Sequence, residues 1–583
     1  MMKSLALQIK EFKKDSILTP FCMILEVIFE MVIPLLMASM IDDGVEAGNL
    51  SHIYKVGAWM VAAAACGLLS GTLGGWTAAR ASAGFARNLR EAMFENIQSF
   101  SFSNIDKFST AGLVTRLTTD VTNIQNAYQM ILRMCFRAPF SMICAMAMAF
   151  VINGRLAAIY LAAVVILGIL LFLIMTSAMK YFQQAFPKYD DMNASVQENV
   201  SAIRVVKAYV REDHETSKFK QASQNIYDIF IKAECNLVFN APLMQITVYT
   251  CILLISWMGA KMIVGGSLTT GELMSLLTYC MNILMSLMML SMVFVMISMS
   301  MASARRIAEV LDETSDLANP AQPVYQAEDG SIEFQNVDFA YHQESGEPVL
   351  QQVNLNIRSG ETIGVIGGTG SAKTSLVNLI SRLYDVTAGK VLVGGRDVRE
   401  YDMEALRNQV AVVLQKNVLF SGTILENLRW GNPNATEEEC RRACHLACAD
   451  EFIEKMPDGY HTYIEQGGAN VSGGQKQRLC IARALLKKPK ILILDDSTSA
   501  VDTATDGKIR QAFAREIPGT TKIIIAQRIS SVESADRIVV MEDGRVHGFG
   551  THEQLLKDDE IYREVYESQT SGGGDFDEKA GED

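Results

Sequence analysis

The sequence predicts a helical membrane domain of six spans, followed by an α/β domain with a phosphate-binding loop. Three observations support this fold class. The first half of the 583-residue chain holds six apolar stretches that are long enough to cross a bilayer. From about residue 331 strand-like and helix-like segments alternate, which is typical of an α/β domain on a mainly parallel sheet. One of those strands runs directly into a glycine-rich loop and then a helix.

The apolar stretches lie at roughly 16–41, 55–79, 131–152, 156–178, 237–264 and 272–300. Short connectors that are nearly free of Lys and Arg alternate with two long, basic connectors at 80–130 and 179–236. The positive-inside rule therefore places the N-terminus, both long connectors and the chain after residue 300 in the cytoplasm. The helical periodicity of the long connectors predicts helices that continue below the membrane. We expect each to turn at a short transverse segment, near 104–108 and near 212–219.

The remaining boundaries follow from changes in composition. We expect the membrane domain at 1–312, a polar linker at 313–330, the α/β domain at 331–568 and a disordered, acidic tail at 569–583. With 49% hydrophobic residues and a net charge of -13, the chain is a poor candidate for nucleic-acid binding.

The eleven cysteines contain no CxxC pair, and several lie inside apolar runs, which indicates reduced core residues. Cys440, Cys444 and Cys448, with His445 between them, would share one helical face and raise the question of a metal site. Because four ligands do not converge there, a stripe of small packing residues is the favoured interpretation.

The glycine-rich loop is the clearest motif for chemistry. Its residues are Gly367, Gly368, Thr369, Gly370, Ser371, Ala372, Lys373 and Thr374, and a helix follows from Ser375. In such a loop, backbone N–H groups and a helix N-terminus face the phosphates, Lys373 reaches the β- and γ-oxygens, and Thr374 binds Mg²⁺. Ala372 departs from the pattern, which has Gly. If this position needs a positive φ, Ala costs about 1 kcal/mol, which would weaken binding without abolishing it.

Asp495 ends an entirely apolar strand and suits a ligand of the Mg²⁺ ion. Further motifs, in order along the chain, are Tyr341, Gln415, and Ser472 with Gly473, Gly474 and Gln475. This set closely resembles the nucleotide-binding domain of ATP-binding-cassette (ABC) transporters. Six spans with long intracellular helices ahead of this domain resemble an exporter-type half-transporter, and the resemblance extends to about residue 568.

The resemblance implies ATP and Mg²⁺ as cofactors and assigns roles to these residues. Tyr341 would stack on adenine, and Gln415 would sense both Mg²⁺ and the membrane domain. Ser472, Gly474 and Gln475 would clamp the γ-phosphate of a nucleotide held by the opposite subunit. It also implies an integral membrane protein of a bacterial cell (inner) membrane, with its nucleotide-binding domain in the cytoplasm.

Two catalytic positions depart from the family pattern. Asp496 stands where a Glu activates the attacking water, and Gln527 stands where a His is expected. The shorter Asp side chain misplaces the general base, which forfeits about 10²–10⁴-fold in rate. Gln527 can donate and accept hydrogen bonds but cannot carry an imidazolium charge. The resemblance thus narrows to heterodimeric exporters with one degenerate site, in which a second, non-identical half-transporter supplies the Glu and the His.

The membrane half carries two further signals. A stripe on the sixth span suits either ordinary helix packing or an adaptable apolar cavity, and its members are Met281, Met285, Met288, Met292, Met296 and Met299. Glu26 and Glu30 in the first span have the same i, i+4 spacing as Arg133 and Arg137 in the third. A structural ion-pair cluster is slightly favoured over a substrate site, because unpaired charges are costly in a bilayer.

Together these features predict one subunit of a heterodimeric exporter that moves hydrophobic or amphipathic compounds, with drugs as the favoured cargo. Alternatives within the class are a lipid flippase, a peptide exporter, or an importer built on the exporter fold. A different class remains open as well, namely a regulatory membrane protein that binds ATP without pumping.

Overall fold

A computed structural model describes residues 2–341, 348–496 and 503–571. The chain forms two compact units. The first comprises Met1–Ser99 and Phe108–Thr314, and the second comprises Phe100–Lys107 and Ser315–Asp583. The short segment Phe100–Lys107 thus belongs with the second unit although it interrupts the first in sequence.

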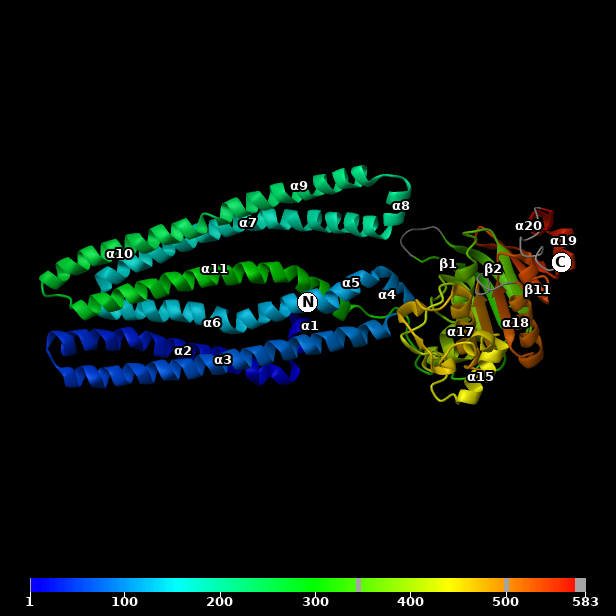
Figure 1. Cartoon of the computed structure of the whole chain (residues 1–583), viewed down its shortest axis with the longest axis horizontal. Coiled ribbons are helices and arrows are strands. Elements are labelled where there is room, and N and C mark those ends of the chain that lie inside the picture. Colours follow the sequence, from blue (N-terminus) through cyan, green and yellow to red (C-terminus); the bar gives the residue numbers. More distant parts are fainter. Residues whose placement is uncertain (1, 342–347, 497–502, 572–583) are drawn as a thin grey trace. The chain divides into compact units, whose positions relative to one another are not determined.

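The first unit consists of helices (Figure 1). Its elements are α1 (Met2–Leu7), α2 (Lys13–Ser39), α3 (Leu50–Ser99), α5 (Thr110–Thr115), α6 (Val121–Ile152), α7 (Gly154–Ser201), α8 (Ile203–Ala208), α9 (Glu212–Leu237), α10 (Asn240–Val264) and α11 (Thr270–Asp312). Six helical segments are long and apolar enough to span a membrane, and these are Lys10–Glu46, Leu50–Ser99, Thr110–Ile152, Gly154–Tyr181, Glu212–Val264 and Thr270–Asp312. Each contains one of the apolar stretches found in the sequence, so the expectation of six spans is confirmed.

The helices of the first unit pack in neighbouring pairs. In Figure 1, α2 lies beside α3, α6 beside α11, and α7 beside α9 and α10. Two buried tyrosines tie helices together through their hydroxyl groups. Tyr160 donates to the carbonyl of Leu276 at 2.8 Å, and Tyr279 donates to the carbonyl of Met31 at 2.7 Å. Each bond satisfies a polar group that would otherwise be costly in an apolar interior.

One of the two expected transverse segments lies elsewhere than the sequence suggested. The first corresponds to α4 (Phe102–Lys107), close to the expected 104–108. The second is α8, whereas 212–219 forms the start of the long helix α9. Glu212, Asp213 and Glu215 occupy the first turn of α9, where negative charge stabilises the helix dipole. The chain turns just before them, with Val210 at a φ of 52°.

The second unit is built on two main sheets, visible in Figure 1. Its strands are β1 (Ile332–Phe339), β2 (Leu350–Ile357), β3 (Thr362–Gly367), β4 (Ala388–Val393), β5 (Arg396–Asp397), β6 (Val410–Val413), β7 (Gly422–Thr423), β8 (Tyr463–Ile464), β9 (Ile491–Asp495), β10 (Thr521–Ile525), β11 (Arg537–Glu542) and β12 (Arg545–Gly550). The larger sheet has the order β12-β11-β3-β10-β9-β6 and is parallel except for β12. The smaller sheet, β2-β1-β4-β5, is antiparallel.

Nine helices lie between or after these strands in the described part of the second unit. They are α12 (Lys373–Ile380), α13 (Met403–Gln409), α14 (Ile424–Arg429), α15 (Glu437–Leu446), α16 (Asp450–Ile453), α17 (Gly473–Leu485), α18 (Thr503–Glu516), α19 (His552–Asp558) and α20 (Glu560–Ser571). Strand β9 is buried on both faces: Leu492 and Leu494 enter one apolar core, while Ile491 and Ile493 enter the other. This explains its continuous apolar sequence.

Two regions of the second unit bear on the sequence-based expectations. Helix α20 continues to Ser571, and so extends into the segment expected to be disordered; residues 572–583 lie outside the described residues.

Cys440, Cys444 and Cys448 are buried in an apolar core. Over the described part of the chain, no cluster of three or more His, Cys, Asp or Glu side chains is arranged to hold a metal ion.

Glu26 and Glu30 of the first span form an ion-pair cluster with Arg137 of the third span, whereas Arg133 forms no ion pair among the described residues. Nη2 of Arg137 lies 3.1 Å from Oε2 of Glu30 and 3.5 Å from Oε1 of Glu26. The side chains of Arg137 and Glu26 are 26% and 23% exposed, so the pair is largely withdrawn from the surface. Gly71 in α3 makes room for it, because a Cβ at this position would lie 3.0 Å from the Glu26 carboxyl group. The structure therefore supports the structural interpretation of these charges.

We expect Arg137→Met to lower the melting temperature of the purified protein, because two carboxylates then share no countercharge. Truncating one partner of a buried pair costs at most about 3–5 kcal/mol. Arg133→Met, one turn earlier on α6, is the matched control, since Arg133 makes no ion pair within the described ranges. Thermal unfolding and uptake of one cationic and one neutral dye should be measured together. An unchanged melting temperature with selective loss of cation uptake would instead indicate substrate recognition.

Candidate functional site

The phosphate-binding loop forms where β3 ends and α12 begins. Gly367 passes so close to its neighbours that a Cβ there would lie 2.2 Å from the carbonyl oxygen of Met541. No larger residue fits this position without moving the strand. The loop then leads into α12, whose first residue is Lys373. The expected order of strand, glycine-rich loop and helix is therefore present.

Ala372 has the conformation that its place in the motif implied. Its φ and ψ are 67° and 24°, in the left-handed region that Gly occupies easily. For Ala this conformation costs about 1 kcal/mol. The loop therefore keeps the geometry of a phosphate-binding loop while carrying some strain at this residue.

The Lys373 side chain folds over the loop. Its Nζ donates hydrogen bonds to the carbonyl oxygens of Gly367 at 2.9 Å and Gly368 at 2.7 Å, and to Oγ of Ser371 at 3.2 Å. Burial lowers the pKa of Lys373, and the nearby carboxylates of Asp495 and Asp496 partly oppose this shift. Anionic phosphate oxygens beside the ammonium would further stabilise its charged form.

Thr374 and Asp495 lie together, as expected of two Mg²⁺ ligands. Thr374 Oγ1 donates to Asp495 Oδ1 at 3.1 Å. Two neighbouring ligands of an octahedral Mg²⁺ ion lie about 3 Å apart, since each bond is about 2.0–2.1 Å long. Burial raises the pKa of Asp495, which is 2% exposed, and the charge of Asp496 adds to the effect. The arrangement fits a divalent cation, which would favour the charged carboxylate.

Asp496, Gln415 and Gln527 also converge. Gln527 Nε2 donates to Asp496 Oδ2 at 2.9 Å, and Gln415 Nε2 approaches the same oxygen at 3.4 Å. The backbone at Asp496 has a φ of 47°, and its N–H donates to the Ile525 carbonyl at 3.1 Å. The two unusual residues found in the sequence are therefore direct neighbours.

Tyr341 lies in an aromatic cluster next to the loop. Its hydroxyl is 2.8 Å from Oγ of Ser375, and its ring meets that of Tyr384 edge-on at 5.1 Å. Tyr384, which sequence analysis did not single out, donates a hydrogen bond to Asp106 of α4 at 2.6 Å. Burial raises the pKa of Tyr384, and the bond to Asp106 adds to the shift, so the phenol remains a donor. Thus the aromatic cluster joins the loop to α4 within one compact unit.

The segment from Ser472 to Gln475 forms the start of α17. Ser472 Oγ accepts from the N–H of Gln475 at 3.3 Å, and Gln475 Oε1 accepts from the N–H of Ser472 at 2.9 Å. This reciprocal capping box includes Gly473 and Gly474 in the first turn. Helix α17 packs on α14, α15 and β6, whereas α12 packs on β3 and β4. The two motifs therefore lie on different groups of elements.

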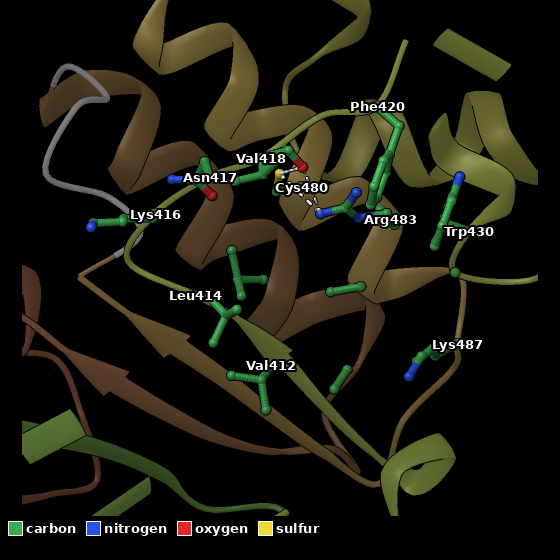
Figure 2. A pocket seen from close by; sticks show the side chains of 14 residues that line it. Val412, Leu414, Lys416, Asn417, Val418, Phe420, Trp430, Cys480, Arg483 and Lys487 are labelled. Atoms are coloured by element: carbon green, nitrogen blue, oxygen red, sulfur yellow. Dashed lines mark hydrogen bonds between the residues drawn. The ribbon is translucent and has the colours of Figure 1, made fainter. Parts of the chain in front are cut away.

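A pocket of about 340 Å³ adjoins Gln415, since Leu414, Lys416 and Asn417 all line it. Figure 2 shows Phe420 and Trp430 on one side of this pocket, with Leu414 and Val412 at another. The rings of Phe420 and Trp430 stack with centroids 4.1 Å apart and planes 8° apart, although Trp430 is 60% exposed. Their apolar faces are available to a ligand or a further segment of protein.

Both units of the chain are similar to parts of known proteins. A family model for the ABC transporter transmembrane region matches residues 16–288, and a model for the ABC transporter matches residues 350–499. The ABC transporter ATP-binding protein YfiB of Bacillus subtilis (strain 168) is 37% identical over 547 residues, which cover 94% of this chain and 95% of the relative. The ATP-dependent lipid A-core flippase of Desulfotalea psychrophila (strain LSv54 / DSM 12343) is 34% identical over 488 residues, covering 83% and 84%.

A solved structure of a bacterial Atm1-family ABC exporter with ATP bound is similar throughout. It has a TM-score of 0.80 and 25% sequence identity, and the match covers 95% of this chain and 98% of the other. The six apolar helices, the mixed sheets and the phosphate-binding loop thus occur in the combination found in exporters. The chain belongs to the ABC transporter family, as an exporter-type half-transporter that couples transport to ATP hydrolysis.

Proposed function

We propose that this protein is one subunit of a heterodimeric exporter and that its own nucleotide site binds ATP but hydrolyses it slowly. The observation that carries the proposal is the direct contact of Asp496 with Gln527 at the position of the catalytic pair. ABC half-transporters commonly work as dimers. A slow site in one subunit therefore calls for a competent site supplied largely by another.

Asp496 is a poor substitute for Glu in two respects. Its carboxylate lies closer to the backbone by one methylene, and a misplacement of about 1 Å can cost roughly 10²-fold in rate. Its Oδ2 also faces the amide groups of Gln527 and Gln415. A carboxylate oxygen engaged in this way offers fewer lone pairs to an attacking water.

Gln527 further weakens the site. A His at this position can become positively charged next to the γ-phosphate, whereas a Gln amide stays neutral. The amide retains the ability to donate one hydrogen bond, which is compatible with holding a nucleotide. The two substitutions together favour retention of ATP over its turnover.

The segment Ser472–Gln475, called the signature segment from here on, shows no departure from the family pattern and supports the other half of the proposal. Ser472, Gly474 and Gln475 would act on the nucleotide of the partner, whose phosphate loop, Glu and His form the competent site. In turn, the partner's signature segment would cover Lys373, Thr374, Asp495 and Asp496.

The cargo proposal rests on the methionine stripe. Met281, Met285, Met288, Met292 and Met299 are exposed on α11, while the opposite face of the helix, with Tyr279 and Ile283, is buried. Met292 is 67% exposed. Met296, the remaining member of the stripe, is partly buried, so the stripe is only partly covered by its own unit. Unbranched thioethers can adapt to varied shapes, which suits hydrophobic or amphipathic cargo such as drugs.

Lipid export is the second candidate. Flippases of lipid A-core are among the relatives, at 34% and 33% identity over 83% of this chain. An apolar, adaptable stripe is compatible with lipid chains as well as with drugs. In either case we place the protein in a bacterial inner membrane, with the nucleotide-binding domain in the cytoplasm. A purely regulatory ATP-binding protein would show no ATP-driven movement of either cargo.

The purified chain without a partner should hydrolyse ATP slowly. Repair of its nucleotide site is tested in the pair that is recovered with the tagged chain, after the partner's catalytic Glu has been replaced by Gln so that only this chain's site can contribute. In that background Asp496→Glu with Gln527→His should raise ATP turnover by about 10²-fold, because the general base is restored. Asp496→Asn serves as the control and should stay at baseline. Rapid turnover by the unmodified chain without any partner would contradict the heterodimer proposal.

In the otherwise unmodified pair, Ser472→Ala or Gly474→Asp should reduce ATPase activity more than Asp496→Asn does. The signature segment serves the competent site, whereas Asp496 belongs to the slow one. Steady-state phosphate release from the reconstituted pair measures the difference. If Asp496→Asn were the more harmful change, the assignment of the two composite sites would be reversed.

Transport by the pair in inverted vesicles tests the cargo proposal. Met288→Ala combined with Met292→Ala should reduce ATP-driven uptake of a hydrophobic dye several-fold, while basal ATPase activity persists. Met37→Ala, an exposed methionine on α2, provides the control. Movement of a fluorescent phospholipid without any dye uptake would favour the lipid exporter instead.

A further inference from the structure

The C-terminal helix holds the backbone at Gln527 through one side chain. Gln569 of α20 donates from Nε2 to the carbonyl oxygen of Gln527 at 2.8 Å. Its Oε1 accepts from the N–H of Ile529 at 2.8 Å. A single amide thus binds both ends of the segment 527–529, which leads away from strand β10.

Helix α20 is itself firmly anchored in the second unit. Tyr562 is fully buried, and its backbone N–H donates to Oδ1 of Asp559 at 2.8 Å. The Tyr562 hydroxyl lies 2.7 Å from Nδ1 of His552 in α19. Gln569 therefore extends from a fixed helix rather than from a free chain end.

The opposite end of the same segment is held by α18. Arg510 Nη1 donates to the carbonyls of Ser530 at 3.1 Å and Ser531 at 3.3 Å. Arg510 also forms an ion pair with the buried Asp506 at 3.1 Å, and Asp506 accepts from the Ser531 hydroxyl at 3.3 Å. The backbone from residue 527 to 531 is consequently held from two helices, while the Gln527 side chain reaches Asp496.

Gln569 is exposed, so ordering its side chain costs conformational entropy. Two hydrogen bonds to the backbone offset this cost. The bonds restrict the peptide from which the Gln527 side chain departs. A small shift of this peptide would move the Gln527 amide away from Asp496 and from any phosphate bound beside it.

We propose that Gln569 is a positioning residue for the nucleotide site: by fixing the peptides at Gln527 and Ile529, it holds the Gln527 amide where it distinguishes ATP from ADP. The inference rests on the proposed function in one respect, namely that Gln527 lies beside the γ-phosphate. The Gln569 side chain binds backbone groups of Gln527 and Ile529. Its effect is transmitted through Gln527, so the C-terminal helix becomes part of the γ-phosphate sensor.

Three variants of the full-length chain test the hydrogen bonds of Gln569 to Gln527 and to Ile529 separately. Gln569→Met removes both with little change in side-chain length. Gln569→Glu retains an acceptor for Ile529 but loses the donor to Gln527. Ser568→Ala, the preceding exposed position on α20, is the control. Equilibrium titration with ATP and with ADP gives the ratio of the two dissociation constants for each variant.

We expect Gln569→Met to reduce the preference for ATP over ADP by about 3–10-fold, with the ADP affinity and the melting temperature unchanged. Gln569→Glu should show most of this loss, and Ser568→Ala none. In a Gln527→Ala background, Gln569→Met should have no further effect, because the side chain that it positions is gone.

Each contrary result would overturn the proposal. An unchanged ratio in Gln569→Met, when Gln527→Ala does change it, would refute the positioning role and leave the role of Gln527 intact. A loss that persists in the Gln527→Ala background, or an equal fall in ATP and ADP affinity with a lower melting temperature, would show general structural support instead. If Gln527→Ala itself left the ratio unchanged, both the γ-phosphate role of Gln527 and the role of Gln569 would be wrong.

Discussion

The parallel pairing of β9 with β10 is the constraint on which the nucleotide site depends. Asp495 is in register with Ile525, so the two strands end at the same edge of the sheet. Asp496 directly follows β9 and Gln527 stands two residues after β10, so both leave the sheet at this edge and their side chains meet at 2.9 Å. Every side chain of β9 is buried, so the register cannot slip without moving apolar side chains out of both cores. The contact between the two unusual residues is therefore a consequence of sheet packing.

Much of this could be predicted from the sequence because the signals are local. The six spans are long apolar runs, and the phosphate-binding loop is a strand, a glycine-rich turn and a helix in direct succession. Even the left-handed backbone at Ala372 follows from its place in that motif. Asp496 and Gln527 were also identified, since each occupies a fixed position relative to an apolar strand.

The features that were missed depend on contacts between distant segments. Tyr384 connects the loop to α4 through Asp106, which lies far earlier in the chain, and Gln569 reaches back to Gln527. Neither belongs to a periodic pattern or a motif, so composition and spacing could not identify it. The second transverse segment is α8, ahead of the expected 212–219, because the chain turns at Val210 and residues 212–219 already belong to the long helix α9. The partner of Glu26 and Glu30 remained open until the structure showed Arg137 next to both.

The capping box at the start of α17 also determines which part of the Ser472 hydroxyl group, its oxygen lone pairs or its hydrogen atom, faces away from the helix. Because its oxygen already accepts the N–H of Gln475, one lone pair is directed inward along the helix. The hydroxyl hydrogen remains able to point away from the helix, together with the N–H groups of the first turn. This end of the helix thus presents hydrogen atoms rather than lone pairs to whatever approaches it. Such a surface attracts a phosphate and repels a cation, and this polarity is established by the helix cap before any second subunit arrives.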